Sequence, residues 1–546
     1  MPRRRKGQPQ DSIDSILLAI SRYEDIDPKT LAHYFDRLDE EWTEGARDKV
    51  LHLLHTNDMA AHSAAVLILS ELATDFDLEE LEDLVADPTV SDLAKLTLAP
   101  VLKELGSEMA DDGLIEYLND PEAAMQQMQS RLLELVGKSE LGVESVLEDV
   151  LSMPVERRLG FVNWLGMSQD QRAAYLLIPL LENQSSKVVM AVIDAFEQLG
   201  SLAAQQTIPA LNYFIANTSN RLLKQYARTA LGRLTMQSAP GTADTSSITV
   251  QPLPFYEARV SFIDGSGSQM VMLSWQRPDN LLKGVNVLYQ DQWGIKDCYG
   301  TDEMNVERWA ELIRDMEEQG FGSFQMPLDY GRALIAEARA LNKRTRHKLP
   351  IAYAVWRPFI EGEEGPKKAL ASTTMLESTP FIPEIARLAE RGGELYQLPE
   401  FMSWMYEPLD RLQPYINRYW GTHSLFESSA RGRGRKGKQK NQKDGMEELV
   451  TEAIIELVDT TWRELYETRL RRQGALFQFT DRTQYVELVR AVAAVLHPDS
   501  AVPAQEQAFV RTMMRLSLEQ GPLRLMAAAL EAGAFGPMPF DLFSDE

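Results

Sequence analysis

The sequence predicts a mainly α-helical protein: an N-terminal α-solenoid of helix pairs, then a small α+β domain with an antiparallel meander, then a helical C-terminal region. One change in hydrophobic pattern leads to this prediction. Apolar residues recur at helical spacing up to about residue 235, and from residue 255 they alternate with a period of two. At 546 residues the chain also exceeds what one compact core accommodates.

Domain boundaries are expected where the composition changes. In chain order the predicted parts are a basic disordered tail (1–10), the solenoid (11–237), a linker (238–254), the α+β domain (255–365), a helical segment (366–427), a basic low-complexity loop (428–445), a helical region (446–536) and an acidic tail (537–546).

The first predicted helix begins after Asp11 and Ser12, whose side chains are suited to cap an N-terminus. Its apolar residues have the spacing of one helical face: Ile13, Ile16, Leu17 and Ile20. From there to Leu234 one such stripe follows another, with almost no signal for strands.

A recurring leucine predicts that these helices form pairs. In each predicted pair of helices, this leucine lies near the end of the second helix. The positions are Leu72, Leu105, Leu135, Leu165, Leu199 and Leu234. The intervals are 33, 30, 30, 34 and 35 residues. Glycine follows at Gly106, Gly166 and Gly200, as expected for a residue with positive φ at a helix end. A single pair cannot bury its apolar stripe alone, so neighbouring pairs are expected to stack.

The last two pairs show the pattern best. Ile178-Pro179-Leu180-Leu181 recurs as Ile208-Pro209-Ala210-Leu211, and each is predicted to open the first helix of a pair. The second helix over 187–199 is predicted to start after Ser185-Ser186. It should bury Val188, Val189, Val192, Ile193, Phe196 and Leu199.

The leucine–glycine helix ends and the Ile-Pro-x-Leu starts resemble the HEAT-repeat (armadillo-like) superfamily, over about residues 40–235. The resemblance implies a curved solenoid with a concave surface for a partner protein. It does not imply a reaction, because a fold alone does not fix a function.

After the linker the pattern predicts strands at 257–263 and 269–276, and a third with Val285, Val287 and Tyr289. Both faces of this meander are apolar, so helices predicted at 304–319 and 328–341 are expected to cover them. The domain is also rich in aromatic residues, namely Tyr256, Phe262, Trp275, Tyr289, Trp293 and Tyr299. We interpret them mainly as core, with base stacking or peptide binding as the alternative.

The charge is strongly negative, with 81 acidic and 56 basic residues and a net charge of −25. Eleven of the basic residues form two short clusters: Arg3, Arg4, Arg5 and Lys6, and Arg431, Arg433, Arg435, Lys436, Lys438, Lys440 and Lys443. An acidic body repels nucleic acid and anionic membrane and attracts basic partners. Contact with nucleic acid is therefore expected only through these two basic segments, whose alternative interpretation is a solvated flexible chain.

Residues 255–365 contain no complete catalytic motif. The segment 265–270 lacks the third glycine of a dinucleotide loop and the spacing of a nucleophile elbow. Cys298, the only cysteine, is interpreted as a small buried residue, and Asp264, Asp291 and Asp297 as turn residues. An enzyme in this region would need Asp264, Asp297, Cys298 or His347 to converge in one pocket.

Two further patterns suggest ligands but are incomplete. His52 and His55 have a spacing that suits two metal ligands, with His62 and Glu40–Glu41 as possible additions, against ordinary packing or surface positions. The segment 432–438 matches the opening of a phosphate loop, but Gln439 replaces the required Ser or Thr and no apolar strand precedes it. Neither a metal nor a cofactor is predicted.

Helices are predicted on both sides of the basic loop. They cover 382–391 and 399–419, then a broad stripe over 449–465, then 486–496, 505–518 and 523–534, the last preceded by Gly521-Pro522.

We therefore predict a non-enzymatic scaffold or adaptor that binds a protein partner through an acidic helical-repeat surface. The alternatives are a nucleic-acid-associated protein that uses residues 431–443 and the aromatic sheet, and an enzyme in 255–365. No apolar run is long enough to cross a bilayer and no secretory signal is evident, so the cytoplasm is the expected location.

Overall fold

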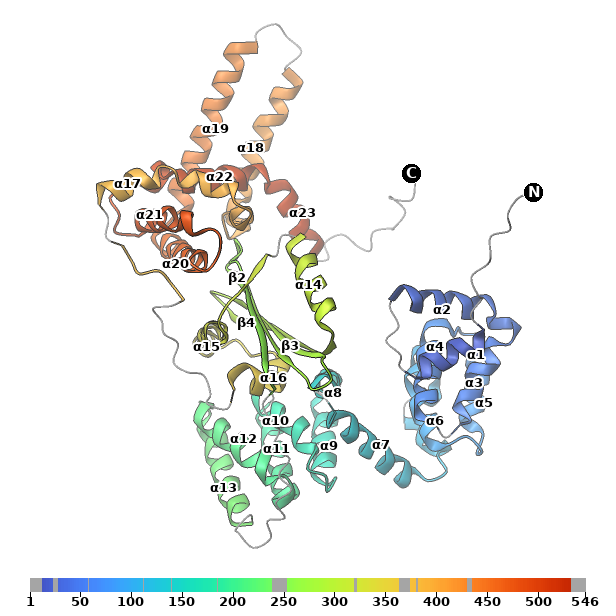
Figure 1. Ribbon diagram of the computed structural model, residues 1–546. Helices are drawn as coiled ribbons and strands as arrows, with labels where there is room; N and C mark the ends of the chain where they lie inside the picture. Colours follow the sequence, from blue (N-terminus) through green and yellow to red (C-terminus); the bar gives the residue numbers. More distant parts are fainter. Residues whose placement is uncertain are drawn as a thin grey trace, which may run out of the picture. The chain divides into compact units, whose positions relative to one another are not determined.

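The computed structural model describes residues 12–22, 28–56, 58–110, 112–138, 140–183, 185–237, 253–318, 322–362, 374–379, 382–429 and 435–531. The chain is mainly helical, with a five-stranded antiparallel sheet in the middle of the sequence and helices before and after it (Figure 1). It divides into two compact units, Met1–Leu135 and Val136–Glu546. The boundary lies within a helix, α7 (Pro121–Val136), and not at the linker 238–254. The helices predicted as one solenoid over 11–237 therefore belong to two units.

The first unit is made of helices joined by short turns. They are α1 (Ile13–Ser21), α2 (Pro28–Glu40), α3 (Ala46–Leu54), α4 (Met59–Leu72), α5 (Leu78–Ala86), α6 (Asp92–Glu104) and most of α7. Ser12 caps α1 as predicted, since its Oγ accepts a hydrogen bond from the Ser15 N–H at 3.2 Å. The four apolar residues predicted for this helix are all buried.

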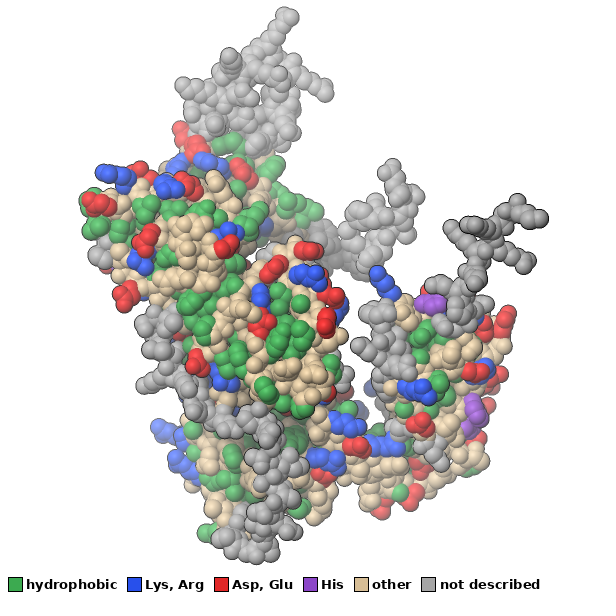
Figure 2. All heavy atoms as spheres, in the orientation of Figure 1, with side chains coloured by type: hydrophobic (Ala, Val, Ile, Leu, Met, Phe, Trp, Pro, Cys, Tyr) green, Lys and Arg blue, Asp and Glu red, His purple; other side chains and the backbone are tan. Residues whose placement is uncertain are grey.

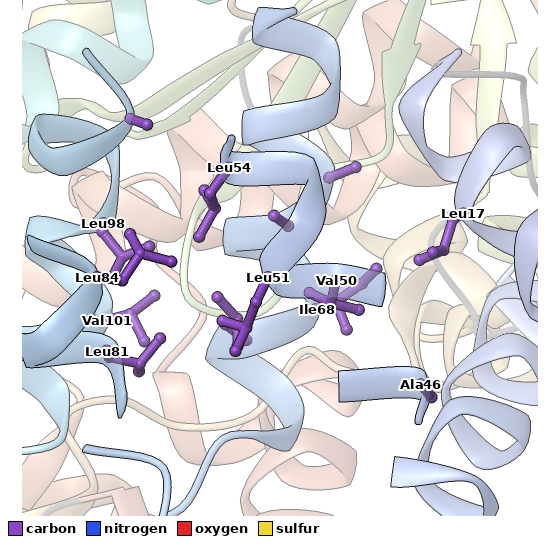
Figure 3. Close-up of a cluster of buried hydrophobic side chains, with 14 of the residues drawn as sticks. Leu17, Ala46, Val50, Leu51, Leu54, Ile68, Leu81, Leu84, Leu98 and Val101 are labelled. Atoms are coloured by element: carbon purple, nitrogen blue, oxygen red, sulfur yellow. The ribbon is translucent and has the colours of Figure 1, made fainter. Parts of the chain in front are cut away.

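The core of the first unit is one apolar cluster to which α1, α3, α4, α5 and α6 all contribute. In Figure 3, Leu81 and Leu84 of α5 lie with Leu98 and Val101 of α6. Fully burying a side chain of this size stabilises a fold by about 1.5–3 kcal/mol, so this apolar cluster is the main source of stability in the unit.

The second unit begins with helix pairs. They are α8 (Glu140–Ser152), α9 (Val155–Gly166), α10 (Ala173–Asn183), α11 (Ser186–Leu199), α12 (Ala204–Asn217) and α13 (Arg221–Gln237). The prediction for α11 is confirmed in detail, because Ser185 caps it and all six predicted apolar side chains are buried. All six recurring leucines lie at or near a helix end, as predicted.

Two details of the repeat pattern are wrong. Pro179 and Pro209 lie inside α10 and α12 and do not open these helices. Gly106 and Gly200 have the predicted positive φ, of 80° and 55°, but Gly166 belongs to α9. A Cβ atom on Gly166 would lie 2.9 Å from the Cβ of Ala195 in α11, so this glycine allows two helices to approach closely.

The meander prediction is confirmed. The strands are β1 (Phe255–Ser261), β2 (Ser268–Gln276), β3 (Leu282–Gln290), β4 (Gly294–Met304) and β5 (Ser323–Gln325). Their order is β4-β3-β2-β1-β5, and every pair is antiparallel. Two strands of the sheet, β4 and β5, were not predicted. β5 joins the outer edge of β1, with Phe324 opposite Val260, and its three residues are too few to show alternation.

Helices cover both faces of the sheet, as predicted (Figure 1). On one face α14 (Val306–Glu318) buries Trp309 and Ile313 against Met272 and Leu282. On the other face lies α15 (Leu328–Thr345), and Gly331 allows the close approach: a Cβ there would lie 3.1 Å from the side chain of Val271.

The remaining helices follow the sheet in the sequence. They are α16 (Ile351–Glu361), α17 (Pro383–Ala389), α18 (Leu409–Ser429), α19 (Arg435–Leu457), α20 (Thr460–Phe477), α21 (Val486–Leu496), α22 (Ala508–Glu519) and α23 (Gly521–Glu531).

Three predictions for this region need correction. The helix predicted at 399–419 begins only at Leu409, after Pro408, because proline disfavours helix in the residue before it. The stripe over 449–465 is divided between two helices, because Asp459 caps α20 by accepting a hydrogen bond from Trp462 N–H at 2.8 Å. The basic loop predicted over 428–445 is helical from Arg435, since Arg, Lys and Gln favour helix and no proline interrupts them.

Buried polar contacts join the sheet to the helices on either side of it in sequence. Arg469 of α20 forms an ion pair with Asp291 at 2.6 Å and donates to the carbonyl oxygen of Gly265 at 2.7 Å. Trp356 of α16 donates to Glu144 of α8 at 2.6 Å. The predicted domain 255–365 is therefore part of one larger unit that also includes α8–α13 and the C-terminal helices.

Candidate partner-binding groove

The first unit has a groove of about 620 Å³ between α1, α3 and α4, which we call the acidic groove. Its lining combines an apolar floor with a charged rim. The lining residues are Asp14, Leu17, Leu18, Ser21, Asp48, Lys49, His52, Leu53, Thr56, Asp58 and Ala61.

The floor of the acidic groove is the outer surface of the apolar core. Leu17 and Ala61 are buried beneath it, at 5% and 6% exposure. Leu18, the next residue along α1, is 50% exposed. Because α1 carries more apolar residues than its contacts inside the unit cover, apolar surface remains open to solvent within the groove.

The rim carries more negative than positive charge. Asp58 caps α4 by accepting a hydrogen bond from the Ala60 N–H at 3.0 Å. Lys49 of α3 pairs with Asp14 of α1 at 2.7 Å, but both side chains are largely exposed, so the pair stabilises the fold by less than about 1 kcal/mol. Asp48 forms no side-chain hydrogen bond or ion pair with any residue that the structure describes.

The charge of the rim agrees with that of the whole region. Residues 12–135 contain 28 Asp and Glu against 8 Lys and Arg. In the view of Figure 2, acidic side chains are spread over the visible surface of this region. The field at the groove is therefore negative and attracts cationic groups.

The turn between α4 and α5 presents an aromatic side chain to solvent. Phe76 is 94% exposed, whereas its neighbour Asp77 is 4% exposed. The Asp77 carboxylate accepts hydrogen bonds from the Thr74 N–H at 2.8 Å and from Arg47 at 3.1 Å. Burial acts to raise the pKa of Asp77, but these bonds outweigh it and hold that pKa below its ordinary value. A rigid turn thus holds Phe76 outward.

The histidines considered as metal ligands have different surroundings in the described structure. His52 and His55 lie at the end of α3 with ring centroids 6.4 Å apart, and both are exposed. His62 is buried instead, with its Nε2 2.8 Å from the carbonyl oxygen of Thr56. Among the residues that the structure describes, no three His, Cys, Asp or Glu side chains are grouped to hold a metal ion.

The residues considered for catalysis have different neighbours. Cys298 is 3% exposed, and burial raises the pKa of its thiol well above the ordinary value, which suits a packed residue. Asp264 accepts hydrogen bonds within its own turn, from Ser266 Oγ and the Ser268 N–H. His347 is stacked on Trp293 with ring centroids 3.5 Å apart.

The remaining two aspartates also have structural roles. Asp291 is paired with Arg469, and Asp297 accepts a hydrogen bond from the Cys298 N–H at 2.8 Å. The turn interpretation therefore holds for Asp264 and for Asp291, which lies in the turn between β3 and β4 and also pairs with Arg469. It is wrong for Asp297, which lies within β4.

The aromatic residues of the sheet domain divide into two groups. Trp275 and Tyr289 are buried, and Phe262 packs against Phe324 and Phe477, which confirms the core interpretation for these three. The exposed residues are Tyr256, Trp293 and Tyr299. Tyr256 lies on β1 and Tyr299 on β4, and β2 and β3 separate these strands, so the two rings do not form one platform.

The two basic segments are described only in part. The tail 1–10 lies outside the described residues, as do Arg431 and Arg433. The other basic residues of the second cluster lie in the first turns of α19: Arg435, Lys436, Lys438, Lys440 and Lys443.

No protein-family model, no curated protein and no solved structure matches this chain. In the described part of the chain, no helix combines the length and apolarity needed to span a membrane.

Proposed function

We propose that the protein is a non-enzymatic adaptor that binds a partner protein through its N-terminal helical region, in line with the HEAT-like pattern of the sequence. The observation that carries this proposal is the acidic groove, where Leu18 lies half exposed between aspartates. Stacked helix pairs of the solenoid type would extend this surface along further repeats.

The chemistry of the groove favours a basic amphipathic helix as the partner segment. Such helices bind grooves through apolar residues on one face, spaced by three or four positions. Its leucine-like anchors would cover Leu18 and Leu53, and its lysines or arginines would face Asp14, Asp48 and Asp58. Phe76, on its rigid turn, is suited to be an additional contact because exposed aromatic residues often dominate binding energy.

Apolar and charged groups would contribute differently to binding. Covering the exposed half of Leu18 stabilises a complex by about 1 kcal/mol, so several anchors are needed for a stable interaction. The aspartates mainly raise the association rate and select the sign of the partner's charge.

A second candidate function is association with nucleic acid, favoured by one observation. Five basic residues lie within the first turns of α19, which concentrates positive charge at one helix end. In an otherwise acidic protein, this charge is suited to bind phosphate backbones.

Both candidates are tested with the full-length protein and defined probes. One probe is a labelled amphipathic helix of Leu and Lys; the second is a Leu and Glu helix of the same length, and the third a single-stranded RNA. The variant Leu18→Ser/Asp48→Asn should weaken binding of the Leu and Lys helix by roughly tenfold or more. The control Leu222→Ser/Asp149→Asn changes the same residue types at exposed positions of α13 and α8, and it should leave binding unchanged.

The adaptor proposal is wrong if the Leu and Glu helix binds as tightly as the Leu and Lys helix, or if the groove variant binds like the control. The second candidate gains support if only the RNA binds and neutralising the basic residues of α19 abolishes that binding.

A further inference from the structure

The second unit contains a cavity of about 490 Å³ whose charge is opposite to that of the protein; we call it the basic cavity. It lies between the helix pairs and the helices α15 and α16. Among the residues that the structure describes, two carboxylates line it, Glu182 and Glu361. Its lining cations outnumber them: Arg332, Arg339, Lys343, Arg346 and Lys348.

Both carboxylates of the basic cavity are already paired. Glu361 accepts from Arg339 at 2.8 Å and from the hydroxyl groups of Tyr353 and Tyr213 at 2.9 and 3.3 Å. Glu182 accepts from Arg357 at 2.8 Å. The carboxylates therefore do not neutralise the other cations.

Three of the cations have no acidic partner among the residues that the structure describes. Lys343, Arg346 and Lys348 are exposed, and no carboxylate within the described part of the chain lies at ion-pair distance from them. Arg332 differs, because its guanidinium donates to the carbonyl oxygens of Phe359 and Ile360. In a chain of net charge −25, a concave surface with three unpaired cations is unusual and suited to an anion.

The backbone that carries these cations is fixed to the sheet. Asn342 accepts from the Ile295 N–H at 2.7 Å and donates to the Ile295 carbonyl oxygen at 3.1 Å. Thr345 donates to the carbonyl oxygen of Trp293 at 3.2 Å, and His347 stacks on the Trp293 ring. The backbone positions that carry the cations are thus set before a ligand arrives, which lowers part of the entropy cost of binding.

Arg346 has a left-handed backbone, with φ of 63°, directly after the end of α15. Glycine is the usual residue at this position of a helix end, because a side chain there is strained. Such strain makes Arg346 a position to test for a role in binding, although Gln169 and Asn280 share the conformation outside the cavity.

We propose that the basic cavity binds a small phosphorylated ligand. A phosphate group has two negative charges near neutral pH and several acceptor oxygens, which matches a set of unpaired lysine and arginine donors. The volume lies within the range of small-molecule sites.

The cations have a simpler alternative role, which is to offset the dipole at the C-terminal end of α15. That role accounts for Lys343, which lies in the last turn. It does not account for Lys348, which lies beyond the helix, or for the strained Arg346. The proposal concerns the second unit and does not depend on the acidic groove.

Calorimetric titration of the full-length protein with pyrophosphate at low salt tests the proposal. Saturable binding is expected, and Lys343→Gln/Lys348→Gln should weaken it by roughly tenfold or more. Arg346→Gly is the sharper variant. It should weaken binding by roughly threefold or more while its urea midpoint stays at or above that of the wild type, since glycine relieves the strain. The matched control Lys436→Gln/Lys440→Gln, in α19, should bind like the wild type.

Three results would overturn the proposal. They are the absence of saturable pyrophosphate binding, equal binding by wild type and by Lys343→Gln/Lys348→Gln, and citrate binding as tightly as pyrophosphate. A mononucleotide probe separates a nucleotide from a simpler phosphate as the source. If single-stranded RNA binds far more tightly than both, the cavity belongs to a nucleic-acid surface and the assignment to a small ligand is wrong.

Discussion

The acidic groove and the basic cavity are both concave, but they are built in opposite ways. The groove takes its shape from neighbouring helices, α1, α3 and α4, and its charges are exposed side chains around an apolar floor. The cavity combines residues from Glu182 to Glu361, and buried ion pairs form part of its wall. Local helix packing is enough to make the first site, whereas the second requires the whole unit to be folded. Changes that break the buried ion pairs in the wall of the cavity should therefore cost more stability than changes at the groove.

The largest effect is expected when the wall of the basic cavity loses Arg339. Arg339→Met leaves Glu361, whose side chain is 7% exposed, without its cationic partner. Breaking a buried ion pair in this way should cost about 2–4 kcal/mol. Hydrogen exchange of α15 and α16 measures the loss. Arg391→Met, which removes an exposed pair with Glu394, is the control and should leave exchange unchanged. Equal exchange in both variants would contradict the buried-network account.

A smaller loss is expected at the turn that holds Phe76. Asp77→Asn weakens the bonds from Arg47 and Thr74 and should cost about 1–2 kcal/mol, measured as faster hydrogen exchange in α5. The pKa of Asp77 is lowered in the folded state, so its stabilisation is present above the unfolded pKa and is lost as the pH falls through the folded value. The difference in stability between wild type and Asp77→Asn, measured by hydrogen exchange in α5, should therefore shrink in acid. A difference that stays constant with pH would contradict this role of Asp77.

The second unit should show the opposite response to pH at Glu144. Burial raises the pKa of this carboxyl, which accepts from Trp356. A raised folded pKa means that ionisation destabilises the fold as the pH rises above the unfolded value. Glu144→Gln keeps an acceptor and removes the charge, so its stability relative to wild type should increase from acidic to neutral pH, in urea unfolding of the full chain. A decrease would show that the charge itself stabilises the contact between α8 and α16.

The smallest effect is expected at the basic residues of α19. Replacing Arg435, Lys436, Lys438, Lys440 and Lys443 by Gln should leave pyrophosphate affinity and the binding of the Leu and Lys helix unchanged, because the described lining residues of both sites come from other helices. The same titrations measure both affinities. A loss in either would mean that density of charge in the sequence, and not placement by the fold, decides where ligands bind.

These two sites also differ in what the sequence alone could predict. Several features were predictable because each depends on residues that are close in the sequence. They are the helix caps formed by Ser12 and Ser185, the positions of the recurring leucines and the antiparallel meander. The acidic character of residues 12–135 was predictable by counting. The groove itself was not, since the half exposure of Leu18 depends on how α3 and α4 pack against α1.

The basic cavity could not be predicted from the sequence. Glu182 and Glu361 are 179 residues apart in the sequence and line the same cavity only because α10 packs on α16. The basic residues at 343–348 are evident in the sequence, but a basic cluster at the end of a helix is ordinary. Only the left-handed backbone of Arg346 distinguishes this cluster, and that conformation is seen only in the structure. The unit boundary within α7 was missed for a related reason, because helical periodicity continues across it.

The most direct test of the account is one titration series with two ligands and two variants of the full-length protein. The ligands are the Leu and Lys helix and pyrophosphate, and the variants are Leu18→Ser/Asp48→Asn and Lys343→Gln/Lys348→Gln. The account predicts that each variant loses roughly tenfold or more in affinity for one ligand only, the helix for the first and pyrophosphate for the second. If both variants weaken the same ligand, or neither weakens any, the protein does not have two separate sites of opposite charge.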